Sequence, residues 1–164
     1  MTEKKKEPAM DVAVRYLEHR ARTEKQVMTR LQETGTYTKD EIDGCLARLK
    51  ELHYVDDTEY ALSYLRRNLE KRRGRQRYFR ELKERGIERD IAQQAIYLYE
   101  DEENLDLADL EQENAFLEAE RFLGNAAPTD KERARAGRRL ASLGYDTALI
   151  YHILSRFGRS SFDA

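Results

Sequence analysis

The chain has 164 residues and a formal net charge of −2 at pH 7, and 38% of its residues are charged. This length suits one ordinary domain or a few small stacked units, and the composition is that of a water-soluble protein. No apolar run approaches the roughly 18 residues of a membrane-spanning helix, and the charged start "MTEKKKEPAM" lacks the apolar stretch of a secretory signal. We therefore expect a cytoplasmic protein without membrane contact. The single cysteine, Cys45, fits a reducing compartment, and we interpret it as a core residue.

The first part of the chain predicts a solvated tail, residues 1–10, and then a three-helix unit, residues 11–53. Apolar residues recur there at the spacing of one helix face, at Ala13, Leu17, Ala21, Val27, Leu31, Ile42, Leu46 and Leu49. Thr23–Gln26 and Thr38–Glu41 have the spacing of a capping box, so each predicts a helix start.

A second three-helix unit is predicted over residues 55–99. The same helical spacing recurs at Ala61, Leu65, Leu69, Ile87, Ile91, Ala95 and Leu98. Its front edge carries Asp56 and Asp57, a pair of carboxylates that could hold Mg²⁺. At this position they are more simply explained as helix caps, with Glu59 completing a weaker form of the capping box.

The last part of the chain predicts an acidic linker, residues 100–110, a third three-helix unit, residues 111–158, and a tail, residues 159–164. The linker is expected to be partly helical or mobile, and it could mask a basic surface. Thr129–Glu132 has capping-box spacing and predicts a helix start in the third unit.

A repeat relates the three units to one another. The segments "RLQETG", "ELKERG" and "RLASLG" each end in Leu-x-x-x-Gly, and apolar residues return after each glycine. Glycine ends a helix cheaply because it adopts the left-handed conformation. Since three short helices bury little surface alone, neighbouring units should stack. We therefore predict an all-α fold of three tandem three-helix repeats stacked into an elongated, curved molecule, with an irregular helical bundle as the alternative.

Catalytic and cofactor motifs are not found in the sequence. The three histidines are His19, His53 and His152, and none is spaced for metal binding with a second ligand. There is no phosphate-binding glycine loop and no Gly-x-Ser-x-Gly nucleophile motif. We expect no enzyme activity, no metal and no cofactor.

The distribution of charge is more informative than its total. Residues 66–89 contain eleven Lys or Arg against four Glu, whereas residues 100–120 contain ten acids and no base. Arginine predominates in the basic stretch, which favours bidentate contact with phosphate or carboxylate. Four acids are too few to neutralise eleven bases, so we favour a surface that faces a polyanion over a solvated surface of Glu pairs. An acidic protein partner would satisfy the same charges.

The stretch "YVDDTEYALSYLRRNLEKRRGRQRYFRELKERGI" resembles the signature of the RecX family. The matching positions are Val55-Asp56-Asp57, Tyr60-Ala61, the basic run around Gly74, Glu81-Leu82 and Arg85-Gly86-Ile87. The first unit matches more loosely, and the third matches through "RRLASLGYDTALIYHILSRF", so the resemblance covers about residues 12–158. Two features depart from the family pattern: Tyr60 stands where phenylalanine is usual, and the link to the third unit is long and acidic.

The resemblance implies a bacterial cytoplasmic regulator of the RecA recombinase, with a role in homologous recombination, DNA repair and the SOS response. Family members consist of tandem three-helix motifs and bind the RecA–single-stranded DNA filament in its groove. They usually inhibit its ATP hydrolysis, strand exchange and co-protease activity towards the LexA repressor, and they have no catalysis of their own. We expect a monomer that contacts single-stranded DNA, or duplex DNA without sequence preference.

Contact with phosphate or the filament is then expected from the basic residues of the second unit and from two arginines of the third. These are Arg66, Arg67, Lys71, Arg72, Arg73, Arg75, Arg77, Arg80, Arg138 and Arg139. We expect their side chains to gather on one concave, solvent-exposed ridge. Two alternatives remain: a helix-turn-helix transcription regulator that reads a duplex site, and an adaptor that docks acidic proteins.

Overall fold

The computed structural model describes residues 5–124 and 127–158, which form nine α-helices and no strand. The helices are α1 (Ala9–His19), α2 (Glu24–Glu33), α3 (Lys39–Glu51), α4 (Asp57–Glu70), α5 (Arg75–Glu84), α6 (Arg89–Glu103), α7 (Leu107–Leu123), α8 (Asp130–Leu143) and α9 (Thr147–Ser155). Within the described residues, no helix combines the length and apolar composition needed to cross a bilayer. The predicted tail 159–164 and residues 1–4 lie outside the described residues.

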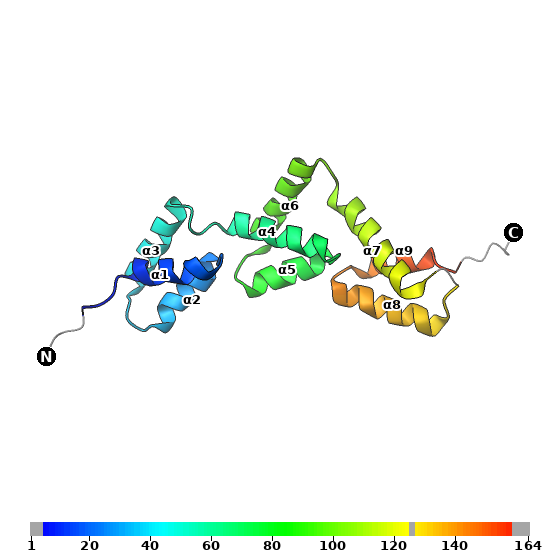
Figure 1. The fold of residues 1–164 in the computed structure, drawn as a ribbon, viewed down its shortest axis with the longest axis horizontal. Helices are drawn as coiled ribbons and strands as arrows, with labels where there is room; N and C mark the ends of the chain where they lie inside the picture. The colour runs from blue at the N-terminus through cyan, green and yellow to red at the C-terminus, as the bar shows by residue number, and fades with distance from the viewer. Residues whose placement is uncertain (1–4, 125–126, 159–164) are drawn as a thin grey trace.

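The helices form three groups of three that follow one another along an elongated molecule (Figure 1). The first unit, α1–α3, lies at one end, α4–α6 in the middle, and α7–α9 at the other end. Each unit has its own core, and the repeated residues Leu31, Leu82 and Leu140 are fully buried in the three cores. Cys45 is a buried free cysteine in the first core, and burial raises the pKa of its thiol. The all-α fold of tandem three-helix repeats is therefore confirmed.

Local sequence signals set many of the helix ends. Reciprocal capping-box hydrogen bonds form at Thr23–Gln26, Thr38–Glu41 and Thr129–Glu132. The repeat glycines Gly35, Gly86 and Gly144 have φ values of 66°, 86° and 98°, in the left-handed region where a Cβ atom is unfavourable. The helix-stop interpretation of the repeat is confirmed at all three positions.

Some predicted element ends are wrong. α1 begins at Ala9, inside the predicted tail, and Met10 packs against the first core. Ala21 lies beyond the end of α1 and is exposed. Leu98, at the end of its predicted apolar stripe, is also exposed, because α6 packs on α4 through the face that carries the buried Ile96.

The acidic segment 100–110 is helical except at residues 104–106, which agrees with the partly helical alternative, and its helical parts belong to α6 and α7. α6 continues to Glu103, where Asn104 adopts a left-handed conformation with a φ of 50° and ends the helix. Asp106 accepts a hydrogen bond from the backbone of the first turn of α7, and the next residue, Leu107, is fully buried against the second core. The third unit therefore starts four residues earlier than predicted.

The first and second units meet where α2 begins, a contact that we call the first joint. The buried hydroxyl of Thr23 donates to the carbonyl oxygen of Arg85 at 2.6 Å. The carboxylate of Asp57 accepts from the backbone N–H of Glu24 at 2.9 Å. The predicted capping role is thus confirmed for Asp56, which caps α4, whereas Asp57 binds the start of a helix in the other unit.

The second and third units meet between the turn after α4 and the turn after α8, a contact that we call the second joint. The N–H of Gly74 donates to the carbonyl of Leu143 at 2.8 Å, and the N–H of Gln76 donates to that of Gly144 at 3.2 Å. Any Cβ atom on Gly74 would overlap the Gly144 carbonyl and lie 2.7 Å from the Tyr145 nitrogen. The two backbones touch directly, so this joint depends on glycine.

Candidate nucleic-acid interface

The turn that ends α4 divides the basic stretch. Arg72 has a φ of 49°, in the left-handed region, and the N–H of Arg73 donates to the carbonyl of Asn68 at 2.9 Å. This is the hydrogen-bond pattern of a Schellman helix end, with arginine where glycine is usual. Because the chain reverses here, neighbouring side chains leave the backbone in different directions.

Arg72 and Arg75 turn towards α7, and we call them the joint arginines. Arg75 Nε lies 2.6 Å from a carboxylate oxygen of Glu111, and the backbone N–H of Arg75 donates to the other oxygen at 2.6 Å. Arg72 Nη1 lies 3.5 Å from Glu118. The two glutamates are only 6% and 5% exposed, and a buried carboxylate needs such a counter-charge. The joint arginines therefore hold α7 against the second unit.

Arg66 is also paired with the acidic segment, through an ion pair with Glu102 of α6. Both side chains are about half exposed, and a pair of this kind contributes about 1 kcal/mol at most. Three of the ten predicted site residues thus meet carboxylates of segment 100–120. This corrects the expectation that all ten share one solvent-exposed ridge.

Other basic side chains surround a cavity of about 450 Å³ beside α4 and α5, which we call the basic cavity. It is lined by Tyr64, Arg67, Asn68, Lys71, Arg73, Arg77, Glu81, Glu84 and Arg85. Five of these residues are cationic and two are acidic, so the cavity carries a net positive charge. The guanidinium carbons of Arg67 and Arg85 lie 5.6 and 4.8 Å from the centre of the Tyr64 ring, which attracts cations to its face.

Arg77 connects the basic cavity to the third unit. It forms an ion pair with Glu81 one helical turn away. Partial burial lowers the pKa of the Arg77 guanidinium, and repulsion from Arg73, Arg80 and Arg139 lowers it further. The group stays cationic at neutral pH because an arginine guanidinium holds its proton far above neutral pH. Guanidinium groups from the second and third units therefore share one electrostatic environment.

The remaining predicted residues point elsewhere. Arg80 lines a separate cavity of about 600 Å³, together with Phe79 and Arg89. Arg138 is exposed on α8 beside Arg139, but successive residues on a helix point in different directions. The predicted residues that line the basic cavity are Arg67, Lys71, Arg73 and Arg77, and Arg139 of the third unit is near enough to Arg77 to affect its charge.

Sequence reasoning missed Arg85 as a site residue. Its guanidinium donates to the carbonyl of Glu81 at 3.0 Å and lies over Tyr64. The available signal was its position directly before Gly86, since a basic side chain at a helix end can donate to the carbonyls that the last turn leaves free. Its carbonyl binds Thr23 at the first joint, so Arg85 belongs to both the joint and the cavity.

Among the side chains that the structure describes, no three His, Cys, Asp or Glu residues are arranged to hold a metal ion. His152 lies 3.3 Å from Gln112. Asp56 and Asp57, the carboxylate pair considered as a Mg²⁺ site, each accept a hydrogen bond from a backbone N–H group. The arrangement is suited to binding anions through guanidinium groups.

Two family models match the chain. One describes the first three-helix domain of RecX and matches residues 9–49, and the other describes the second three-helix domain of RecX and matches residues 56–96. The chain belongs to the RecX family. The matched RecX domains correspond to the first and second units, and the third unit lies outside both matches.

Curated proteins named regulatory protein RecX are similar to this chain. That of Listeria welshimeri is 34% identical over 102 residues, which cover 60% of this chain and 37% of the Listeria protein. That of Clostridium botulinum strain Eklund 17B is 26% identical over 148 residues, covering 88% of this chain and 66% of its own length. The aligned part therefore spans between about one third and two thirds of these RecX relatives.

Solved RecX structures share the fold. The crystal structure of RecX from Lactobacillus salivarius superimposes with a TM-score of 0.74 at 24% identity, over 90% of this chain and 93% of that one. A second crystal structure of regulatory protein RecX gives a TM-score of 0.70 at 20% identity, over 90% and 70% of the two chains. The likeness extends beyond the two matched RecX domains.

Proposed function

We propose that this protein regulates a RecA recombinase by binding the RecA–single-stranded DNA filament through the basic cavity. The observation that carries the proposal is the grouping of five cationic side chains around this cavity, with Arg139 of the third unit near enough to repel Arg77. Membership of the RecX family supplies the recombinase as the partner. The outcome is inhibition of the filament, and the protein acts without catalysis of its own.

The chemistry of the cavity supports phosphate as the group it binds. A guanidinium donates two parallel hydrogen bonds to a phosphate, and several of them in one place track a flexible backbone better than a single charge does. Backbone contacts of this kind do not distinguish bases, so binding is expected to be independent of sequence. A protein seated on the DNA in the filament groove would obstruct strand exchange, and with it ATP hydrolysis and LexA cleavage.

The direct test adds the protein to RecA filaments preformed on single-stranded DNA and follows ATP hydrolysis. The wild-type protein should lower the rate. The double variant Arg67→Gln, Arg73→Gln removes two charges of the basic cavity that lack an ion-pair partner among the described residues, and it should require at least about tenfold more protein for the same effect. An unchanged rate with the wild-type protein contradicts the proposal.

Binding to bare single-stranded DNA tests the contact itself. If the five cations of the basic cavity and Arg139 each meet a phosphate, affinity should fall about 300-fold between 50 and 200 mM salt. An adaptor for acidic proteins would not bind bare DNA. A strong preference for one duplex sequence would favour a helix-turn-helix transcription regulator instead.

A further inference from the structure

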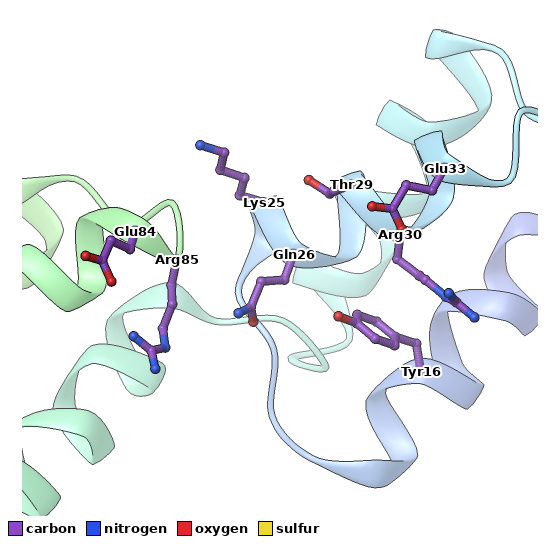
Figure 2. Close-up of a pocket in the computed structure, with 8 residues that line it drawn as sticks. All are labelled: Tyr16, Lys25, Gln26, Thr29, Arg30, Glu33, Glu84 and Arg85. Atoms are coloured by element: carbon purple, nitrogen blue, oxygen red, sulfur yellow. The ribbon is translucent and has the colours of Figure 1, made fainter.

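A second cavity adjoins the basic cavity across the first joint. It has a volume of about 320 Å³ and lies between α2, α1 and the end of α5. Its lining residues are Tyr16, Lys25, Gln26, Thr29, Arg30, Glu33, Glu84 and Arg85 (Figure 2). Glu84 and Arg85 line both cavities. The two cavities therefore lie next to each other with Glu84 and Arg85 between them, and we call the pair of cavities the groove.

The second cavity has the same chemical character as the first. Lys25, Arg30 and Arg85 bring three positive charges, against the negative charges of Glu33 and Glu84. None of the ion pairs formed by the described side chains involves Lys25 or Arg30. Figure 2 shows Lys25 and Gln26 of α2 extending toward the end of α5, and Arg30 extending toward Tyr16 of α1. The net charge therefore stays positive along the groove.

An aromatic ring with arginines over it occurs in both cavities. The guanidinium carbons of Arg22 and Arg30 lie 4.1 and 5.7 Å from the centre of the Tyr16 ring. Tyr64 has the corresponding arrangement with two arginines in the basic cavity. The two tyrosines are equivalent in the repeat, because each follows a fully buried alanine by three residues, Ala13 in α1 and Ala61 in α4.

The third unit also contains an aromatic ring with an arginine over it. Phe122 follows the fully buried Ala119 of α7 by three residues, and the guanidinium carbon of Arg139 lies 5.5 Å from its ring centre. Arg139 stands directly before Leu140 just as Arg30 stands directly before Leu31. In Figure 1 the second helices of the three units, α2, α5 and α8, follow one another along one edge of the molecule. An arginine therefore lies over the equivalent ring in each unit, although in the second unit, where Glu81 precedes the repeated leucine, it comes from Arg67 and Arg85 instead.

We propose that single-stranded nucleic acid continues from the basic cavity across the first joint, with Lys25 and Arg30 as further phosphate contacts. Tyr16 is a positioning residue that holds the Arg30 guanidinium at the cavity. This inference rests on the proposed function and extends it to a unit in which sequence reasoning placed no contact. Cationic side chains at intervals beside aromatic rings are the usual lining of a groove that follows a single strand. A compact acidic protein surface would not need a contact between an aromatic ring and an arginine in each repeat.

The test measures affinity for a long homothymidine oligonucleotide as a function of salt. The double variant Lys25→Gln, Arg30→Gln should lower the slope of log affinity against log salt by about 1.4, since each phosphate contact with a single strand contributes about 0.7. The control, Lys39→Gln, Arg48→Gln, removes the same net charge from α3, away from both cavities, where Arg48 forms only an exposed ion pair with Glu51. The control should keep the wild-type slope. Equal effects of the two variants would show that only net charge matters and would overturn the proposal.

Substitutions of Tyr16 test how Arg30 is positioned. Tyr16→Phe keeps the ring and should bind as the wild type does. Tyr16→Leu keeps apolar packing but loses the cation–ring contact, so affinity should fall about two- to fivefold and the salt slope should fall with it. A loss of affinity that is equal for both substitutions, or one without a change in slope, would overturn this role.

The outcomes separate this inference from the proposed function. If the wild-type protein binds, the Arg67→Gln, Arg73→Gln variant loses affinity and the Lys25→Gln, Arg30→Gln variant does not, the inference is wrong and the proposed function stands. If the wild-type protein does not bind single-stranded DNA at all, both are wrong. Loss of affinity in both variants, with an unaffected control, supports both.

Discussion

The joint arginines and the arginines of the basic cavity alternate in the sequence but have different roles in the structure. Arg72 and Arg75 bind buried glutamates of α7, while Arg73 and Arg77 lie beside them in sequence and line the basic cavity. All four belong to one short run of like charge. Local charge density therefore shows that a segment needs anionic partners, but not whether the partner is a ligand or the protein itself.

The difference has a structural cause in the second joint. The left-handed conformation of Arg72 and the backbone contact at Gly74 reverse the chain here. As a result, the joint arginines face α7, whereas Arg73 and Arg77 face the basic cavity. A variant that removes all the arginines of this run would change the joint and the cavity together. Separate substitutions are needed to test the comparison.

The largest effect is expected from Gly74→Ala. The new Cβ atom meets the backbone of Gly144 and Tyr145, which cannot move without opening the second joint. Overpacking of this kind should lower the free energy of unfolding by about 3 kcal/mol, measured by chemical denaturation. Gly44→Ala is the matched control, because Gly44 lies within α3 with nothing close to it, and it should raise stability by about 0.5–1 kcal/mol. A Gly74 variant as stable as the wild type would contradict the direct backbone contact.

The next effect compares the two sets of arginines directly. Arg75→Ala leaves the carboxylate of Glu111 buried without its counter-charge, which should lower the free energy of unfolding by about 2 kcal/mol, a figure reduced for the partial exposure of Arg75. Arg73→Ala removes a cation from the basic cavity and should change stability by less than about 0.5 kcal/mol. Denaturation of the two variants measures the difference. Equal stabilities would remove the distinction between joint and cavity.

The smallest effect concerns the first joint, which is made by side chains and not by touching backbones. Burial raises the pKa of the Asp57 carboxyl above its ordinary value of 3.8, and the negative charges of Glu24 and Asp56 raise it further, against the opposing effects of the Glu24 N–H and Lys50. Because the pKa is higher in the folded state, ionisation of Asp57 destabilises the fold. This penalty is fully present above the raised pKa and disappears as the pH falls through it.

Asp57→Asn keeps an oxygen that accepts from Glu24 and removes the charge. It should therefore raise the free energy of unfolding by about 0.5 kcal/mol at neutral pH, and this difference from the wild type should shrink in acid. Asp57→Ala loses the acceptor and should lower stability by about 1 kcal/mol. Denaturation at neutral and at acidic pH gives both comparisons. An Asn variant that is less stable than the wild type at neutral pH would show that the charge itself strengthens the joint.

Much of the fold could be predicted from short-range patterns. Capping boxes such as Thr38–Glu41, helix-ending glycines such as Gly86, and the repeated leucines depend on residues within one or two helical turns, so they are visible in the sequence. The same patterns predicted the three units, and the resemblance of residues 54–87 to the RecX signature indicated the family. They also located the basic stretch that supplies most of the cavity.

Only the tertiary structure decided which arginines of the basic stretch are paired with glutamates and which remain available to bind a ligand. The pairing of Arg75 with Glu111 joins residues 36 positions apart, and that of Arg72 with Glu118 joins residues 46 apart. Both depend on how the third unit sits against the second. The helical character of the acidic segment and the groove between Arg85 and α2 likewise follow from packing between units. Sequence patterns report the periodicity of single helices, whereas burial and ion pairing depend on distances that arise only when the units come together.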